Sequence, residues 1–237
     1  MPMNNEFKEG RFIKRLNRFV GLVNIDEYGP IPVHVPSSGR MSELLVHNAP
    51  VIVQPFEQNG KHKTQGRLVR VLYQGNSGSW VSVDSHLPNR LFSKVVKEQH
   101  VPEFREYQQL RPEVTFGESR LDFLGIGEDR QAFIEVKSVT LVEDGVALFP
   151  DAPTARGTRH IKALVEALEM GYDAFLVFVV QRGDADSFSP HGQRDPVFAQ
   201  SVREAVDAGV VVLAYDCHVT PAEVTWRGPL PVILDRR

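Results

Sequence analysis

The amino-acid sequence predicts a mixed α+β protein of two domains, in which a small β-barrel precedes an α/β domain with a central mixed sheet. Short segments typical of strands, separated by Gly, Pro, Asn and Ser, fill the first eighty-odd residues. Apolar residues then recur at helical spacing directly after Pro88, and strand and helix patterns alternate over the rest of the chain. We therefore place a domain boundary near residue 85, with domains at 1–85 and 86–237.

The first domain is expected to be a barrel of about five strands. Five strands in about eighty residues is the size of an OB-fold, although periodicity alone does not choose among small barrels. The strand patterns lie at 18–25, 32–36, 44–56, 66–74 and 79–85, with a turn at 27–30.

The second domain is expected to be a β-meander followed by alternating helices and strands. One helix begins at Pro88, whose missing N–H suits a first turn. A second helix covers 159–170 and ends at Gly171, and a third covers 196–208 and ends at Gly209. The order of elements predicts helices on both faces of the sheet, and the C-terminal tail has no regular pattern. The strand patterns lie at 114–117, 120–127, 132–143, 174–181 and 211–219.

Composition narrows the classes of protein to which this chain can belong. No apolar run approaches the length of a membrane span, and the N-terminus lacks the apolar core of a signal peptide. A single cysteine, Cys217, excludes an internal disulfide framework and a cysteine-based zinc site. These features predict a cytoplasmic protein with no membrane partner.

Charge is distributed unevenly along the chain. The net charge is −3, but residues 1–100 contain 13 Lys and Arg against 8 Asp and Glu, whereas residues 101–237 contain 14 against 22. A basic half is a hint of phosphate contact, and chance fluctuation of charge along a chain is the alternative.

One group of residues in the second domain has the composition of a hydrolytic site. Side chains alternate along a strand, so Glu135 and Lys137 share one face while Ile134 and Val136 point the other way. Asp122 lies between apolar residues on the preceding strand, and a turn between the two strands would bring Asp122 beside Glu135.

The chemistry expected of this group is metal-dependent cleavage of phosphodiester bonds. The carboxylates of Asp122 and Glu135 and the backbone carbonyl of Val136 would bind Mg²⁺ or Mn²⁺, and Glu113 is a candidate for a further ligand. Lys137 would orient or deprotonate the attacking water, or neutralise charge in the transition state. The alternative is a cross-strand ion pair on a solvated face, worth about 0.2–1 kcal/mol.

The spacing of these residues resembles that of the PD-(D/E)XK nuclease superfamily, and nearly the whole chain resembles the sugar fermentation stimulation protein family, SfsA. The resemblance implies an N-terminal OB-like domain and a restriction-endonuclease-like C-terminal domain. It also implies DNA binding and an effect on sugar (maltose) metabolism genes. The stretches that carry it, in order, are RFVGLV, VHVPSSGRM, LPNRLF, SRLDFL, IEVKSVTLVEDGVALFPDAPTARGTRH, FVVQRGDADSFSP, GVVVLAY and PLPV.

Basic residues outside this group are candidates for contacts with nucleic acid. Solvated faces of strands and helices are the alternative for all of them, and His160 alone is more typical of a structural histidine. In the barrel, Phe12 and Phe19 alternate with basic residues and are expected in the core. Thr158 is the N-cap candidate for the second helix, and Asn89 either caps the first helix or flanks the metal site. The candidate nucleic-acid contacts are Arg15, Arg18, Lys61, Lys63, Arg67, Arg156, Arg159 and His160.

The function expected from these observations is binding of DNA, or of RNA, with cleavage that depends on Mg²⁺ or Mn²⁺. The first alternative is a non-enzymatic DNA-binding regulator in which Asp122, Glu135 and Lys137 are vestigial. A second alternative is an interaction module whose barrel binds protein or carbohydrate. Affinity without cleavage would favour the first alternative, and indifference to nucleic acid would favour the second. The oligomeric state is not predicted.

Overall fold

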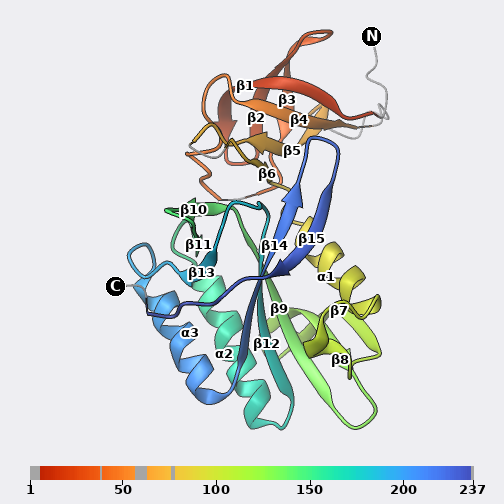
Figure 1. The fold of residues 1–237 in the computed structure, drawn as a ribbon, viewed down its shortest axis with the longest axis vertical. Coiled ribbons are helices and arrows are strands. Elements are labelled where there is room, and N and C mark those ends of the chain that lie inside the picture. The colour runs from red at the N-terminus through yellow and green to blue at the C-terminus, as the bar shows by residue number, and fades with distance from the viewer. Residues whose placement is uncertain (1–5, 38, 57–62, 76–77, 236–237) are drawn as a thin grey trace. The chain divides into compact units, whose positions relative to one another are not determined.

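The computed structural model describes residues 6–37, 39–56, 63–75 and 78–235, and the chain forms two compact units (Figure 1). The first unit consists of Met1–His86 together with Gln181–Asp184 and His218–Thr225. The second unit consists of Leu87–Val180, Ala185–Cys217 and Trp226–Arg237. Two short segments from late in the sequence therefore belong to the N-terminal unit.

The first unit is a closed, OB-like β-barrel, as the sequence predicts. Its strands are ordered β3-β2-β1-β4-β5-β6, and a parallel pairing of β3 with β5 closes the barrel. The strands are β1 (Lys8–Asn17), β2 (Val20–Ile25), β3 (Gly29–His34), β4 (Pro50–Pro55), β5 (Gly66–Leu72) and β6 (Trp80–Ser82).

The sequence interpretation differs from the structure at the beginning of the barrel. Strand β1 was not predicted, because two irregularities in its pairing with β2 interrupt the alternation of buried and exposed residues. Phe12 lies in the barrel core at 1% exposure, which confirms that prediction. The prediction for Phe19 was wrong, because Phe19 lies in the turn between β1 and β2 and is 47% exposed.

The two late segments of the first unit are held to the barrel by backbone and guanidinium contacts. The Ser82 N–H of β6 donates to the Gln181 carbonyl at 2.9 Å, and the Arg182 guanidinium lies 4.6 Å from the centroid of the Tyr73 ring. The buried Arg70 of β5 donates to the carbonyl of Pro221 at 2.8 Å. The barrel is thus supported by residues far from it in sequence.

The second unit is built on a mixed sheet of six strands, ordered β15-β14-β12-β9-β8-β7. Strands β7, β8 and β9 form an antiparallel meander, while β9, β12 and β14 are parallel. The tail, predicted to be irregular, forms β15 beside β14, where its alternating exposed residues gave only a weak strand pattern. The strands are β7 (Gln109–Phe116), β8 (Ser119–Ile126), β9 (Gln131–Val139), β12 (Asp173–Val180), β14 (Val211–Val219) and β15 (Val224–Pro229).

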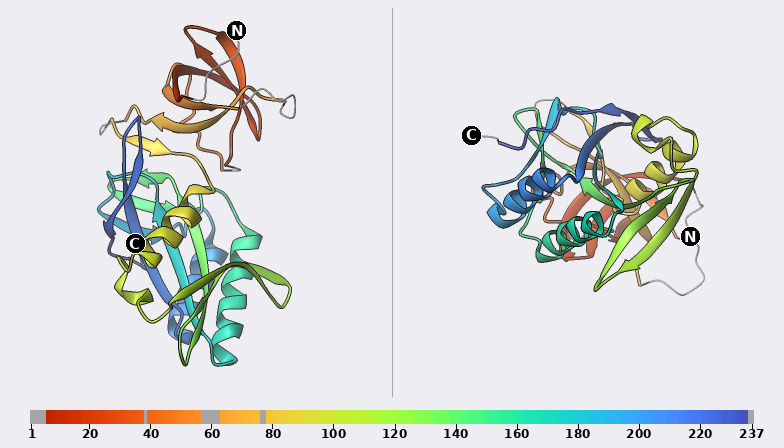
Figure 2. Two further views of the ribbon diagram at one scale, coloured as in Figure 1. Left: turned by 90° about the vertical axis from the view of Figure 1, so that its right-hand side faces the viewer. Right: turned by 90° about the horizontal axis from the view of Figure 1, so that it is seen from below.

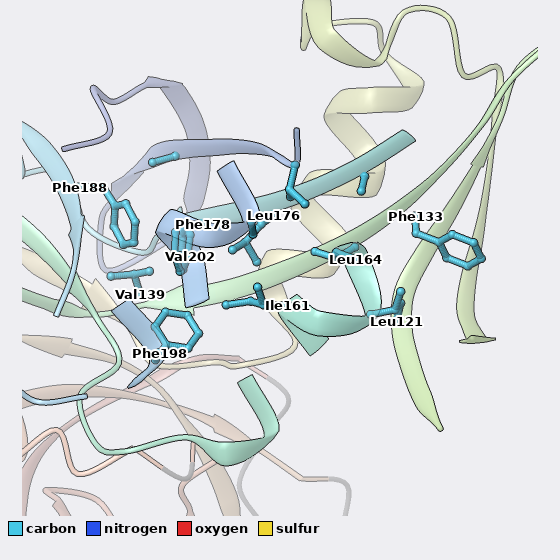
Figure 3. Close-up of a cluster of buried hydrophobic side chains, with 14 of the residues drawn as sticks. Leu121, Phe133, Val139, Ile161, Leu164, Leu176, Phe178, Phe188, Phe198 and Val202 are labelled. Atoms are coloured by element: carbon cyan, nitrogen blue, oxygen red, sulfur yellow. The ribbon is translucent and has the colours of Figure 1, made fainter. Parts of the chain in front are cut away.

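Three helices cover the two faces of this sheet, as expected. Helices α2 (Ala155–Glu169) and α3 (Pro196–Ala208) lie side by side (Figure 2) and bury apolar residues on one face, including Ile161, Leu164 and Val202 (Figure 3). Helix α1 (Leu87–Lys97) packs on the opposite face, where the Phe92 ring lies 5.6 Å from that of Phe123. The site described below lies where strands of this sheet pass between α1 and α2.

The ends of the helices follow the predicted signals in two cases and depart from them in one. Gly171 and Gly209 follow α2 and α3 with φ angles of 87° and 109°, which confirms both glycine stops. Helix α2 begins a full turn earlier than predicted. Its N-cap is Thr154, whose side chain accepts from the Gly157 N–H, so the prediction that Thr158 caps the helix was wrong.

A small sheet was not predicted from the sequence. It consists of β10 (Leu141–Glu143), β11 (Val146–Phe149) and β13 (Ser187–Pro190), ordered β10-β11-β13, and one short 3-10 helix covers Pro102–Phe104. The segment 132–143, interpreted as one strand, is divided at Thr140 between the two sheets. Within the described part of the chain, no helix combines the length and the apolar character that crossing a membrane would require.

Asp195 connects the starts of α2 and α3. Its carboxylate accepts from the Phe198 N–H at 3.0 Å, which caps α3, and from the Thr154 N–H at 2.8 Å, immediately before α2. The side chain is buried, so each lost partner would leave a backbone N–H group without an acceptor. Asp195 therefore holds α2, which carries His160, in place.

We predict that Asp195→Ala lowers the free energy of unfolding by about 2–4 kcal/mol, the sum of a lost helix cap and an unsatisfied buried N–H group. Chemical denaturation would measure the loss. Asp195→Asn, which keeps one acceptor oxygen, should lose roughly half as much. Unchanged stability in the alanine variant would contradict this assignment.

Candidate active site

The candidate site forms where β8 and β9 separate. Their antiparallel pairs run from Ile126 and Gln131 to Phe123 and Ile134. The next pair in this register would be Asp122 and Glu135, but Asp122 instead accepts the Val136 N–H through its side-chain Oδ2 at 2.8 Å. A carboxylate thus replaces a backbone acceptor, and the two acidic side chains lie at the point of separation.

Asp122 is held from two directions. Its Oδ1 accepts from the amide Nδ2 of Asn89 in α1 at 2.8 Å, while its Oδ2 faces the backbone of β9. Burial raises the pKa of Asp122 to about 6, and the charge of Glu135 adds to the shift against the lowering effect of these two hydrogen bonds and of Lys137. Asp122 is therefore an electrostatically unfavourable carboxylate at neutral pH in the absence of a cation.

Glu135 is the most buried member of the group. Its Oε1 lies 2.5 Å from Lys137 Nζ and 2.5 Å from His160 Nδ1, and the residue is 3% exposed. Burial opposes its ionisation, but the charge of Lys137 and the hydrogen bond from His160 outweigh burial, so the pKa of Glu135 is lowered. Its second oxygen, Oε2, is buried and has no hydrogen-bond partner among the residues that the structure describes.

His160 is buried and is not placed to contact a nucleic acid directly. It was a candidate nucleic-acid contact, but the residue is 4% exposed, and from its place on α2 its ring points to Glu135 of β9. Arg156, one turn earlier on α2, donates through Nε to His160 Nε2 at 3.3 Å and is itself exposed. A chain of contacts therefore leads from the surface of α2 through His160 to Glu135.

The remaining predicted site residues of the second unit are Glu113 on β7, Val136 on β9 and Arg159 on α2. Glu113 of β7 lies between Pro112 and Val114, which pair with Phe123 and Leu121 of β8. It has a φ of 53° and forms an ion pair with Arg120. Arg159 is exposed on α2. Val136, whose carbonyl was the predicted ligand, contributes its N–H to Asp122.

The predicted contacts in the barrel have different surroundings. Arg15 donates to the carbonyls of Ser37, Gly39, Arg40 and Arg18, so its guanidinium holds the loop after β3. Arg18 is exposed beside the ring of Phe19.

Two further basic candidates lie near β5. Arg67 donates to Gln54 at 3.0 Å and lies 4.0 Å from Asp84. Lys63 is exposed. Lys61 falls outside the described residues.

The structure gives Asn89 and His160 roles that the sequence did not predict for them. Asn89 was interpreted preferably as a helix cap, but it lies inside α1 and its amide holds Asp122. His160 was not recognised as a partner of Glu135, because the two are far apart in sequence and meet only when α2 packs on the sheet. The sequence feature that could have indicated burial of His160 is the spacing of apolar residues on α2, which places position 160 on the buried face of the helix.

Comparisons with known proteins agree with this architecture. The model of the sugar fermentation stimulation protein RE domain matches residues 86–223, and the model of the SfsA N-terminal OB domain matches residues 13–83. Sugar fermentation stimulation protein homologs from Desulforamulus reducens and Symbiobacterium thermophilum are each 45% identical to this chain. These alignments cover 97% and 95% of the chain and 93% and 94% of the relatives.

A solved structure extends the comparison to three dimensions. The structure of Pyrococcus furiosus SfsA in complex with Ca²⁺ is 30% identical in sequence, with a TM-score of 0.88 and coverage of 98% of both chains. Two domain models matched in order, close relatives over nearly the full length and a shared fold lead to one conclusion: the chain belongs to the sugar fermentation stimulation protein (SfsA) family.

Proposed function

We propose that this protein is a metal-dependent phosphodiesterase that binds and cleaves nucleic acid, DNA or RNA, at the site formed by Asp122, Glu135 and Lys137. The main support for this site is an unsatisfied buried carboxylate oxygen. Within the described part of the chain, the Oε2 of Glu135 is a buried carboxylate oxygen without a hydrogen-bond partner, and it belongs to a group with a second carboxylate of raised pKa and an ammonium group. Unfavourable groups of this kind are concentrated at functional sites.

The oxygen atoms of the group fit a hard divalent cation. Mg²⁺ and Mn²⁺ are bound by oxygen ligands, and Mg²⁺ commonly uses one or two carboxylates together with water and substrate phosphates. Asp122 and Glu135 are the two carboxylates we assign to this role. Among the residues that the structure describes, no three His, Cys, Asp or Glu side chains are grouped as a metal cage.

Glu113 is the further carboxylate that we include in the proposed metal site. Its neighbours in β7 pair with the residues on either side of Asp122, and its left-handed backbone is uncommon for a residue other than glycine. Its side chain is 63% exposed and paired with Arg120, so joining the site requires release from that arginine. The Pyrococcus furiosus SfsA structure is a complex with Ca²⁺, which supports a hard-cation site in the family.

The charges around the site favour an anionic substrate. Arg156, Arg159 and Lys162 are exposed on the first turns of α2, the helix that contacts Glu135 through His160. A bound cation would supply polarisation of the scissile phosphate and a lowered pKa for a coordinated water. Lys137 is placed to neutralise charge on the phosphate or to orient the water. His160 holds the other oxygen of Glu135, Oε1.

Cleavage should depend on Lys137 and Asp122. We predict that Lys137→Ala and Asp122→Ala each reduce the rate of cleavage of labelled DNA or RNA in Mn²⁺ by about 100-fold or more, because each removes a charged group that acts on the reacting phosphate. Gel analysis of products over time would measure the rates. Lys97→Ala, which removes an exposed lysine at the end of α1, is the control and should cleave like the wild type.

Equal rates in all of these proteins would remove the assignment of the site. Nucleic acid that is bound but remains intact with every protein and every divalent metal would instead favour the non-enzymatic regulator. The same assay tests whether the resemblance to the PD-(D/E)XK nucleases extends to nuclease activity.

The raised pKa of Asp122 predicts a stability effect that does not require a substrate. The cost of ionising Asp122 is absent below pH 4, develops between the ordinary value of 3.8 and about 6, and is full above pH 6. We predict that the unfolding free energy of metal-free Asp122→Asn, relative to that of the wild type, is about 1–3 kcal/mol higher at pH 7.5 than at pH 4, because the amide lacks one acceptor oxygen at both pH values but never carries the charge. Thermal and chemical denaturation at both pH values would measure it.

The matched control is Asp129→Asn, which changes an exposed carboxylate in the turn between β8 and β9. It should be neutral at both pH values. Mn²⁺ should stabilise the wild type at pH 7.5, since a ligand that binds the folded state raises its stability, and should stabilise Asp122→Asn much less. A relative stability of Asp122→Asn that does not rise between pH 4 and pH 7.5 would contradict the electrostatic description of the site.

His160 is predicted to position Glu135 rather than to touch the substrate. His160→Ala should lower cleavage and apparent Mn²⁺ affinity by about 10- to 100-fold, the usual effect of losing a partner of a metal ligand. His160→Asn places an amide near the position of Nδ1 and should recover much of the loss, whereas His160→Gln mimics Nε2 and should not. Titration of the rate with Mn²⁺ distinguishes positioning from destabilisation, and equal defects in all three variants would contradict the positioning role.

A further inference from the structure

The turn between β1 and β2 exposes an aromatic ring that the barrel core does not need. Phe19 is 47% exposed, and Leu16 at the end of β1 is 50% exposed. The Arg18 guanidinium lies 5.5 Å from the centroid of the Phe19 ring. The exposed Phe19 ring beside a planar cation offers an aromatic face on which a planar ligand can stack.

The backbone that carries this ring is fixed on both sides. The Phe19 N–H donates to Asn17 Oδ1 at 2.9 Å, and the Phe19 carbonyl accepts from the Val35 N–H at 2.8 Å. Arg15 adds a hydrogen bond to the Arg18 carbonyl at 2.5 Å. The ring is therefore presented to solvent from an ordered backbone, so little conformational entropy would be lost when a ligand stacks on it.

Charge on this hairpin indicates the kind of partner. Residues 10–25, which form most of β1, the turn and β2, contain Arg11, Lys14, Arg15 and Arg18 and contain no Asp or Glu. Lys14 and Arg18 are exposed, whereas Arg15 is occupied by backbone carbonyls. The hairpin is thus complementary to a polyanion, and an apolar protein surface would leave these cations without a counterion.

We propose that the tip of the β1–β2 hairpin binds a single-stranded segment of nucleic acid, with one unpaired base stacked on Phe19 and neighbouring phosphates contacted by Arg18 and Lys14. This inference rests on the proposed function and defines its substrate class. In a duplex the faces of the bases are covered by their neighbours, so only an unpaired base offers its face to the ring. Aromatic stacking with a basic backbone contact is the usual way in which proteins hold single strands.

The test measures binding of fluorescein-labelled dT15 and of a dT15–dA15 duplex by anisotropy, using the full chain in EDTA so that no metal-dependent cleavage takes place. We expect the wild type to bind dT15 more tightly than the duplex. Phe19→Ala should weaken dT15 binding by roughly five- to a hundredfold and should leave duplex binding nearly unchanged. Leu16→Ala is the matched control, because it removes an equally exposed apolar side chain from the same hairpin, and should retain binding.

A second variant detects stacking directly. Phe19→Trp should bind dT15 at least as well as the wild type, and its added indole fluorescence should be quenched on binding, relative to the wild type, whose two tryptophans are elsewhere. Arg18→Ala should reduce the slope of log affinity against log salt by about one phosphate contact. Because Phe19 is exposed, melting temperatures of the variants should match that of the wild type.

The outcomes separate this inference from the proposed cleavage. Unchanged dT15 affinity in Phe19→Ala, equal affinity of the wild type for strand and duplex, or an unquenched Phe19→Trp indole would each overturn it. None of these three results would affect the proposed metal site, since Mn²⁺ stabilisation of the wild type is measured without nucleic acid. Conversely, loss of stacking in Phe19→Ala with intact Mn²⁺ stabilisation supports the hairpin site even if Lys137→Ala cleaves like the wild type.

Discussion

The candidate site depends on one substitution of hydrogen-bond partners, in which the carboxylate of Asp122 takes the Val136 N–H that a neighbouring strand would otherwise accept. In a continuous antiparallel pair, Asp122 and Glu135 would stand directly opposite each other, with Cβ atoms about 5 Å apart, an arrangement that is destabilising for like charges. Separation of β8 and β9 at Phe123 and Ile134 removes this constraint without leaving the Val136 N–H unsatisfied. The shape of the site therefore follows from where the strand pairing ends.

The same interaction explains why the two carboxylates differ electrostatically. Glu135 is served by Lys137 and His160, which together lower its pKa despite burial. Asp122 receives only neutral donors, from Asn89 and Val136, and its pKa rises to about 6 because burial and the charge of Glu135 outweigh them. A buried pair with one carboxylate stabilised and the other not is poorly suited to a purely structural role, since an ion pair would stabilise the fold at less cost. The proposed divalent cation would supply the positive charge that the neutral hydrogen-bond donors of Asp122 lack.

Much of this site was predictable from the sequence, and the exceptions have physical causes. Alternation along β9 places Glu135 and Lys137 on one face, and the meander brings Asp122 beside them, because both rules act over a few residues. His160 could not be assigned in the same way, since its contact with Glu135 depends on how α2 packs against the sheet. Phe19 was misplaced because irregularities in the pairing of β1 with β2 shift the faces of the hairpin, and no simple period in the sequence records them.

The basic residues show where sequence reasoning reaches its limit. Arg15 and Arg18 lie three positions apart in a stretch without acidic residues, and from the sequence they were equivalent candidates for phosphate contact. In the structure, Arg15 donates to four carbonyls and holds the loop after β3, whereas Arg18 lies exposed against the Phe19 ring. A guanidinium that already satisfies backbone carbonyls would leave them unpaired if it turned to a phosphate. The two arginines therefore have complementary tasks: Arg15 fixes the backbone of the hairpin, and this fixed backbone is what allows Arg18 and Phe19 to present a preformed surface to a ligand.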